Sequence, residues 1–253
     1  MSKNEVAVKE TAGALAVIDF SADLNAGFEE ADQKSFAIPF LSVLQSGSPQ
    51  CKKSEGAYVK GAEEGFLFNS VSQEFVDGNV GVTVIPCHFV RTLNEWTPRD
   101  SGGGLVAVHS AAEGDELLLS CSKGPKGEDV LPNGNYLTDT RNHYVLIVHA
   151  DGAYEPAFFP LGSTQIKKSK RWMTLMNNIR IGNNIAPMFS QMYKVTTIPE
   201  SNDKGSWFGV KIEHIGQVTD VELYKAAKAF REMVKAGTAK PVDTNQGCDE
   251  PGF

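Results

Sequence analysis

The chain lacks any hydrophobic run long enough to cross a membrane. Its longest apolar stretches, such as residues 144–150, have the length of a strand, whereas a spanning helix needs about 20 apolar residues. The start of the chain carries acids at Glu5 and Glu10, and it lacks the basic start and apolar centre of a secretory signal. We therefore expect a cytoplasmic protein with no membrane partner.

Motifs for metal binding, redox chemistry and catalysis are also missing. The four cysteines include no C-x-x-C pair, and the five histidines show no H-x-x-x-H, H-x-H or H-E-x-x-H spacing, so the sequence predicts no metal site and no other cofactor. Neither the G-x-x-x-x-G-K-[ST] loop that cradles nucleotide phosphates nor the G-x-S-x-G turn of hydrolases occurs. We expect a protein that is not an enzyme.

The composition of the chain is that of a folded protein, and its apolar patterns predict many strands. Of its 253 residues, 41% are hydrophobic and 22% are charged, which suffices for a sizeable core. Alternating or continuous apolar segments predict strands at residues 65–71, 80–90, 105–109, 116–121, 144–150, 157–161, 192–198 and 207–214. The turn signals Asp77-Gly78 and Asn133-Gly134 predict hairpins. The expected fold class is α+β, with a twisted antiparallel β-sheet core and a few helices, and not necessarily an OB-fold.

One globular domain is expected to occupy the middle of the chain. Residues 1–34 contain few large apolar groups and predict a flexible N-terminal arm. Residues 35–238 predict a single domain, because no repeat or long linker interrupts them. This domain closes with a helix that follows Asp220. Residues 239–253 show no periodicity and predict a flexible acidic tail ending in Phe.

Charge is distributed unevenly along the chain. The net charge is −7, yet residues 156–199 contain no acid. The same segment contains the cations Lys167, Lys168, Lys170, Arg171, Arg180 and Lys194. Because the local field rather than the net charge attracts a polyanion, this segment is the candidate site for phosphate groups. The alternative is a solvated basic helix face that pairs with acids elsewhere in the fold.

The densest part of this segment predicts a helix over residues 164–181, with Ser163 or Thr164 as its N-cap. On that helix Lys167 shares a face with Lys170 and Arg171, and Lys168 and Trp172 lie beside them. Stacking of a base on an aromatic ring is worth about 1–3 kcal/mol and tolerates any base sequence. The combination favours single-stranded nucleic acid, whereas the alternative for Trp172 is a core residue that anchors the helix.

A second aromatic and cationic group lies in residues 96–104. Trp96 and Arg99 offer stacking surfaces beside Gly102, Gly103 and Gly104, whose backbone could approach phosphates closely. Trp207, at the start of a predicted strand, is a further candidate for base stacking. The alternative for residues 96–104 is a hairpin loop that only joins two strands.

The tail carries a candidate site for a protein partner. A terminal phenylalanine can fill an apolar pocket on a partner while carboxylates meet basic groups around that pocket. The predicted partner-binding residues are Phe253, Glu250 and Asp249. This tail resembles the C-terminal tip of single-stranded-DNA-binding proteins of bacteria and phages, although only three acids lie in its last eleven residues.

Three further segments carry a family resemblance. Residues 38–49, 95–105 and 141–146 resemble tailed-bacteriophage single-stranded-DNA-binding proteins of the RNA polymerase cofactor type. The resemblance extends over residues 36–181. It implies a protein that coats template strands or holds them open, and it transfers no contact residue.

Our hypothesis from the sequence is sequence-tolerant binding of single-stranded DNA for phage replication or transcription, by phosphate neutralisation and base stacking. The expected partners are single-stranded DNA and a phage RNA polymerase or replication proteins, and the expected location is the cytoplasm of the infected bacterial host. A strand-coating protein is also expected to form a homo-oligomer. The alternative is a protein–protein module that docks its basic helix on a host or phage polymerase.

Overall fold

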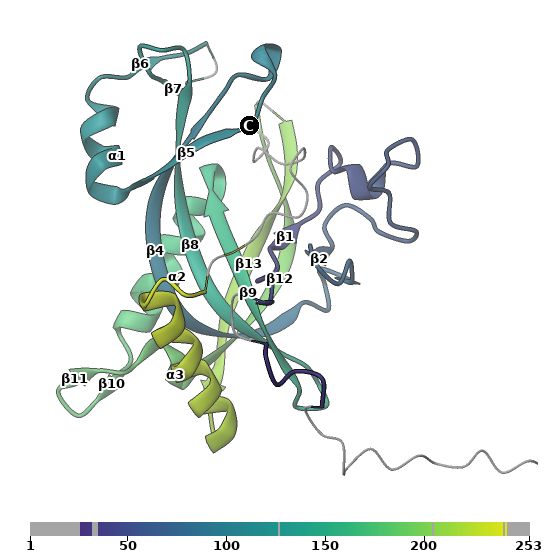
Figure 1. Cartoon of the computed structure of the whole chain (residues 1–253), viewed down its shortest axis with the longest axis vertical. Helices are drawn as coiled ribbons and strands as arrows, with labels where there is room; N and C mark the ends of the chain where they lie inside the picture. Colours follow the sequence, from purple (N-terminus) through teal and green to yellow (C-terminus); the bar gives the residue numbers. More distant parts are fainter. Residues whose placement is uncertain (1–25, 32–34, 126, 204, 240, 242–253) are drawn as a thin grey trace, which may run out of the picture.

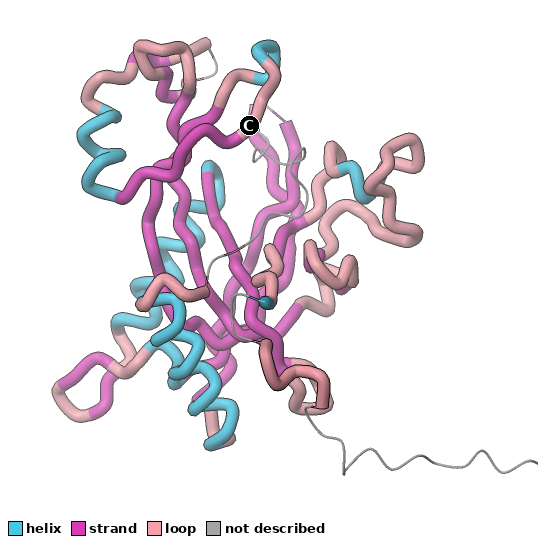
Figure 2. The backbone as a smooth tube through the Cα atoms, viewed as in Figure 1, coloured by secondary structure: helices cyan, strands magenta, loops and turns pink. Residues whose placement is uncertain are grey.

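The computed structural model describes residues 26–31, 35–125, 127–203, 205–239 and 241. Its centre is a curled antiparallel sheet (Figures 1 and 2). The sheet consists of β4 (Val82–Trp96), β5 (Leu105–Ser110), β6 (Ser122–Lys123), β7 (Asp129–Val130), β8 (Tyr136–Val148), β9 (Tyr154–Gly162), β12 (Gln191–Asn202) and β13 (Gly205–Gln217). The predicted α+β class with a twisted antiparallel core is confirmed.

Strands β4 and β8 form the long central pair of the sheet. They pair from Thr83 opposite Val148 to Trp96 opposite Tyr136. The first residues of β4 also pair with β12, and its last residues pair with β5. Likewise β8 pairs with β7 at its start and with β9 over the rest of its length. The two ends of the central pair therefore carry different neighbouring strands.

Both faces of the sheet are buried where the start of β4 pairs with the end of β8. Successive residues of a strand point to opposite faces. Val84 and Val145 point into one buried cluster, which we call the inner cluster and which also contains Phe159, Trp172 and Tyr193. Their neighbours Ile85 and Leu146 point into a second buried cluster, the outer cluster, which also contains Phe158 and Phe230. A strand buried on both faces reads as a continuous apolar run. This explains why β8 ends with four consecutive apolar residues.

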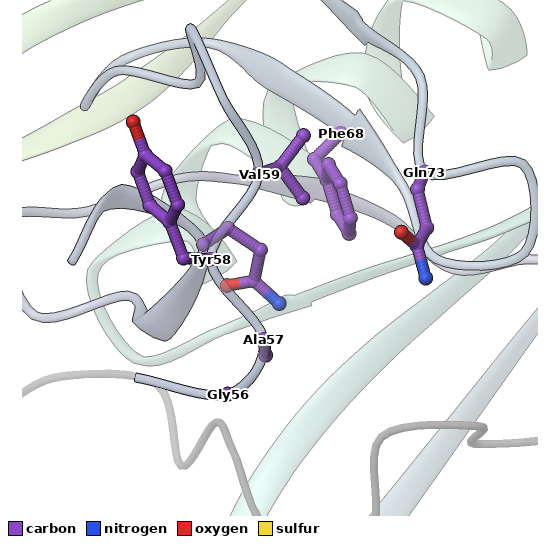
Figure 3. Close-up of a pocket in the computed structure, with 7 residues that line it drawn as sticks. Gly56, Ala57, Tyr58, Val59, Phe68 and Gln73 are labelled. Atoms are coloured by element: carbon purple, nitrogen blue, oxygen red, sulfur yellow. The ribbon is translucent and has the colours of Figure 1, made fainter. Parts of the chain in front are cut away.

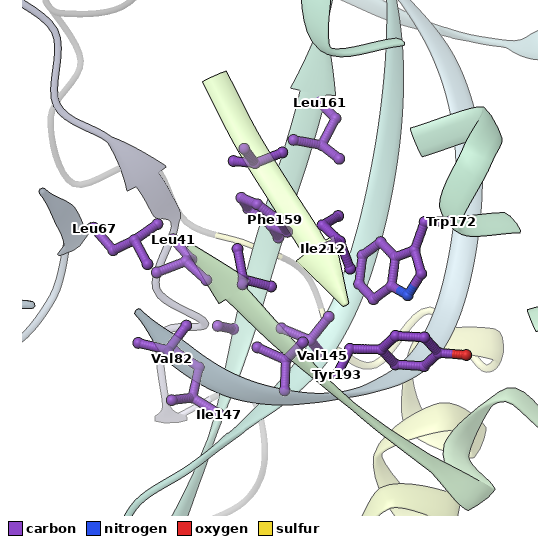
Figure 4. Close-up of a cluster of buried hydrophobic side chains, with 14 of the residues drawn as sticks. Leu41, Leu67, Val82, Val145, Ile147, Phe159, Leu161, Trp172, Tyr193 and Ile212 are labelled. Atoms are coloured by element: carbon purple, nitrogen blue, oxygen red, sulfur yellow. The ribbon is translucent and has the colours of Figure 1, made fainter. Parts of the chain in front are cut away.

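One helix covers each cluster. Helix α2 (Ile166–Asn177) contributes Trp172 and Met176 to the inner cluster, where Figure 4 shows Trp172 beside Tyr193. Helix α3 (Val221–Lys235) contributes Phe230 to the outer cluster. This helix begins where the sequence predicts, because the Asp220 carboxylate accepts hydrogen bonds from two backbone N–H groups of the first turn.

Helix α1 (Ala111–Leu118) lies where we expected a strand, and the prediction of a strand over residues 116–121 is wrong. Ser110 and Glu113 form a capping box, in which the Ser110 hydroxyl accepts from the Glu113 N–H and the Glu113 carboxylate accepts from the Ser110 N–H. This signature starts a helix, and leucine, which dominates residues 117–119, favours helix over strand.

A smaller sheet packs beside the central one. It consists of β1 (Leu41–Val43), β2 (Leu67–Asn69) and β3 (Phe75–Val76). The Asp77-Gly78 hairpin is not formed, because β3 pairs with β2 instead of β4. Gly78 instead lies against Thr197 of β12, where an added Cβ would collide with the Thr197 hydroxyl. The hairpin at Asn133-Gly134 is confirmed, since it joins β7 to β8.

The remaining strands, β10 (Arg180–Ile181) and β11 (Asn184–Ile185), form a separate hairpin that projects from the body (Figure 1). At the end of the described chain, Ala239 is buried in the outer cluster and Pro241 forms a bridge with Ile38. The domain boundaries stay a prediction. Within the described residues, no helix combines the length and the apolar composition that a membrane span requires.

Candidate nucleic-acid interface

Helix α2 is fixed to the sheet along one face. Ser169, Trp172 and Met176 recur at helical spacing on that face, and all three are buried. The Ser169 hydroxyl lies 2.7 Å from Nε2 of His143 on β8. Burial, and to a smaller extent Arg141, lowers the pKa of His143 to about 3. The imidazole beneath the helix is therefore neutral at neutral pH.

Trp172 is a core residue, so the stacking role predicted for it is wrong in this conformation. Its exposed fraction is 0%. The indole stacks on the His143 ring with centroids 4.5 Å apart and meets the Tyr193 ring edge-on at 5.5 Å. A base could reach the indole only after α2 left the sheet. The alternative reading is the one the structure supports: Trp172 anchors the helix that carries the cations.

The start of α2 differs from the prediction as well. Residues 163–165 form a 3-10 turn, and neither Ser163 nor Thr164 caps the α-helix. Gln165 fixes this end instead, because its side-chain oxygen accepts a hydrogen bond of 2.9 Å from the backbone N–H of Val210 on β13. This hydrogen bond was not predictable from the sequence, because a single glutamine carries no pattern that links it to a distant strand.

With one face of α2 buried, the other presents Lys167, Lys170 and Arg171 to solvent. Within the described part of the chain, none of these three cations forms an ion pair. The absence of acids from residues 156–199 thus agrees with the structure, in which these exposed cations form no ion pair with any acid of the described residues.

Lys168 differs from the other cations of α2. Its Nζ lies 2.6 Å from Oε1 of Glu200 on β12. The other carboxylate oxygen of Glu200 accepts a hydrogen bond of 3.1 Å from the indole N–H of Trp207 on β13. Although partial burial alone would raise the pKa of Glu200, the hydrogen bonds from Lys168, Trp207 and Gln165 outweigh it and lower that pKa.

Glu200 therefore gathers two of the predicted DNA-binding residues at one place. Lys168 and the half-buried Trp207 share this carboxylate as a partner. For Lys168, the structure matches the alternative of a basic residue that pairs with an acid elsewhere in the fold. Glu200 was not among the predicted site residues, although it is the first acid after the acid-free segment.

A groove runs between α2 and the last two strands of the sheet. It encloses about 200 Å³, and its residues are Lys168, Arg171, Trp172, Leu175, Ile198, Val210, Lys211 and Ile212. Leu175 and Ile198 belong to its apolar part, and Lys168, Arg171 and Lys211 are its charged residues. Two of these cations have acidic partners, since Lys168 pairs with Glu200 and Lys211 Nζ lies 3.0 Å from Oε2 of Glu213. Lys211, which the sequence did not predict as part of the site, lies between the buried Val210 and Ile212 on β13. An apolar groove with cations suits a ligand that has both flat apolar and anionic parts.

Arg180 lies beyond the end of α2, on the projecting hairpin β10–β11. It is exposed, and it pairs across the hairpin with Ile185. Ile181 and Ile185 are also exposed, at 59% and 51%. The hairpin thus adds one cation and two apolar side chains beyond the groove.

Trp96 and Arg99 do not join this surface. Phe89 of β4 pairs with His143, which lies beneath Trp172. Trp96 lies seven residues further along β4 than Phe89, and at a rise of ~3.3 Å per residue this separates the two residues by about 23 Å. An odd separation also places the Trp96 side chain on the opposite face of the strand from Phe89. There the Trp96 indole donates a hydrogen bond of 2.8 Å to the Thr138 hydroxyl, and exposed Arg99 begins the next 3-10 turn.

The partner-binding residues Phe253, Glu250 and Asp249 lie outside the described residues. Among the residues that are described, no group of three or more His, Cys, Asp or Glu side chains is arranged to hold a metal ion. The histidines have other neighbours, since His109 lies 2.9 Å from Glu95 and His214 lies 2.8 Å from Gln191.

Comparison with known proteins places the chain in a family. No curated protein and no solved structure matches it. Residues 8–240 match the family described as Pam3 phage gp34-like protein. This match spans the central sheet, all three helices and the cationic segment. The chain therefore belongs to the Pam3 phage gp34-like protein family, a family of phage proteins.

Proposed function

We propose that this protein binds single-stranded DNA without sequence preference, and that it coats template or holds it open during phage replication or transcription. The observation that carries the proposal is the exposed face of α2, where Lys167, Lys170 and Arg171 have no acidic partner among the residues that the structure describes and lie beside an apolar groove. Binding requires no bond making or breaking, so we propose a protein that is not an enzyme.

The geometry of this surface supports a polyanion as the ligand. Lys167, Lys170 and Arg171 occupy neighbouring positions on one helix, so they can contact successive phosphates of one backbone. Single strands release about 0.7 counterions for each phosphate that is neutralised. Three such contacts supply affinity that does not depend on the base sequence.

The groove favours single-stranded DNA over duplex DNA as the ligand. Bases of a single strand are free to leave their stack and to enter an apolar groove, whereas those of a duplex are paired and stacked. Leu175 and Ile198 offer the apolar contact, and Arg171 lies where a guanidinium plane can stack on a base. The half-buried Trp207 replaces Trp172 as the aromatic candidate for stacking.

The remaining parts of the proposal concern assembly. We propose that several copies bind cooperatively along one strand, in the cytoplasm of the infected bacterium. Phe253, Glu250 and Asp249 would then recruit a phage RNA polymerase or a replication protein.

The test is fluorescence anisotropy with labelled single-stranded and duplex oligonucleotides of the same sequence. We expect tighter binding to the single strand, and a similar affinity for strands of different base composition. Equal affinity for the duplex would contradict the single-strand proposal. No binding to either would favour the alternative, in which α2 docks on an acidic surface of a polymerase, and a complex that survives nuclease treatment would establish it.

A further inference from the structure

A second pocket lies beside the small sheet, between β2 and the chain that joins β1 to β2, apart from α2. It encloses about 280 Å³, and its residues are Gln50, Gly56, Ala57, Tyr58, Val59, Phe68 and Gln73. Figure 3 shows Tyr58 and Gln73 on opposite sides, with Val59 and Phe68 between them. Small-molecule pockets in proteins begin near 300 Å³, so this one suits a single ring system and not a whole dinucleotide.

Gln50 gives the pocket an unused hydrogen-bonding group. Its exposed fraction is 3%, and its side-chain oxygen Oε1 is buried with no hydrogen-bond partner among the described residues. An acceptor removed from water without a partner destabilises the folded protein. A ligand that donates an N–H to Oε1 would therefore recover a hydrogen bond that folding has left unmade.

The other residues narrow the chemistry of the ligand. None of the residues that line the described pocket carries a charge, so the part of the ligand inside is neutral. The half-buried ring of Tyr58 favours a flat partner, and the buried Phe68 forms the apolar floor of the pocket. Gln73 has a φ of 58° at the turn between β2 and β3, and its amide lies at the side of the pocket (Figure 3).

We infer that this pocket binds a neutral nucleobase that carries an amino group, with adenine as the best match. A glutamine amide pairs with adenine in a bidentate way, because its oxygen accepts from the amino group while its nitrogen donates to a ring nitrogen. The base could belong to a free nucleoside or to a strand, and the chemistry is the same in both cases.

Isothermal titration calorimetry of the full chain with adenosine tests this inference, with purine riboside, which lacks the amino group, as the second ligand. We expect adenosine to bind and purine riboside to bind at least about fivefold more weakly. Gln50→Met removes the amide at similar volume and should abolish the preference for adenosine. It should also fold at least as stably as the wild type, because it removes the unpaired acceptor.

Tyr58→Leu gives an independent variant at the half-buried wall of the pocket, and Tyr154→Leu is its matched control, because Tyr154 is an exposed tyrosine of β9. Tyr58→Leu should weaken adenosine binding, whereas Tyr154→Leu should bind as the wild type does. The inference is overturned if adenosine fails to bind the wild type, or if Gln50→Met binds it with unchanged preference over purine riboside.

Two oligonucleotides separate the sources of the base. If a base of the strand enters the pocket, Gln50→Met should weaken binding of oligo(dA) and leave oligo(dT) unchanged. If the ligand is a free nucleoside, both oligonucleotides should bind Gln50→Met as they bind the wild type, while adenosine binding changes. Adenosine binding is also expected to be unchanged when the α2 cations are removed. The proposal for this pocket and the proposal for the strand-binding surface are therefore tested independently.

Discussion

Removing the exposed cations of α2 should change how DNA binding responds to salt. The variant is Lys167→Gln with Lys170→Gln and Arg171→Gln. For single strands each neutralised phosphate contributes about −0.7 to the slope of log affinity against log salt concentration. Three contacts therefore contribute about −2, or roughly a 20-fold loss of affinity between about 50 and 200 mM salt. The variant should lose this part of the slope, together with most of its affinity at low salt.

The assay is fluorescence anisotropy with labelled oligo(dT) over that salt range. A matched control removes two lysines and one arginine from α3, as Lys225→Gln with Lys228→Gln and Arg231→Gln. These lie on the helix that covers the outer cluster, so they should leave the slope unchanged. Both variants replace side chains outside the buried core and should unfold within about 0.5 kcal/mol of the wild type. An unchanged slope in the α2 variant, or an equal loss in the α3 variant, would show that the cations of α2 are not the phosphate contacts.

Three further predictions concern the residues around α2. Trp172→Phe should lower the free energy of unfolding in urea by about 1–3 kcal/mol and leave oligonucleotide affinity unchanged at temperatures where the variant is folded. A loss of affinity in the folded variant would restore a stacking role for Trp172. Glu200→Gln should free Lys168 and steepen the salt slope by about 0.7, and a shallower slope would count against an accessible Lys168. The pKa of His143 lies at about 3 in the folded state and at 6.5 when unperturbed, so on acidification the unfolded state binds the proton first. The free energy of unfolding should therefore fall by about 1.4 kcal/mol per pH unit on acidification below 6.5. His143→Gln should flatten this decline in urea titrations between pH 6.5 and 5, and an equally steep decline would assign it to other groups.

Strand content and fold class could be predicted from the sequence because apolar periodicity reports burial directly. Residues 144–150 read as a continuous apolar run because β8 packs against an inner and an outer cluster. The helix after Asp220 was predictable from its cap and from the helical spacing of the apolar residues Leu223, Ala227, Phe230 and Val234. The prediction failed at residues 116–121, where three consecutive leucines have no period of their own and the capping box upstream decides the structure.

The candidate site was predictable only in part. The lack of acids in residues 156–199 identified the cationic helix, because composition is visible along the chain. Which of its side chains face outward depends on the contact with His143, which no local pattern reveals. Pairing of Lys168 with Glu200 and burial of Trp172 are likewise long-range contacts. Spacing on a helix therefore identified the group of residues but not the role of each one.

The most direct test of the central claim is ultraviolet crosslinking of the full chain to oligo(dT), followed by mass spectrometry of the crosslinked peptides. We expect crosslinks in peptides from α2 and from β13, which line the same groove, and their loss in the variant that lacks Lys167, Lys170 and Arg171. Crosslinks confined to other parts of the chain, with none in α2 or β13, would contradict the central claim.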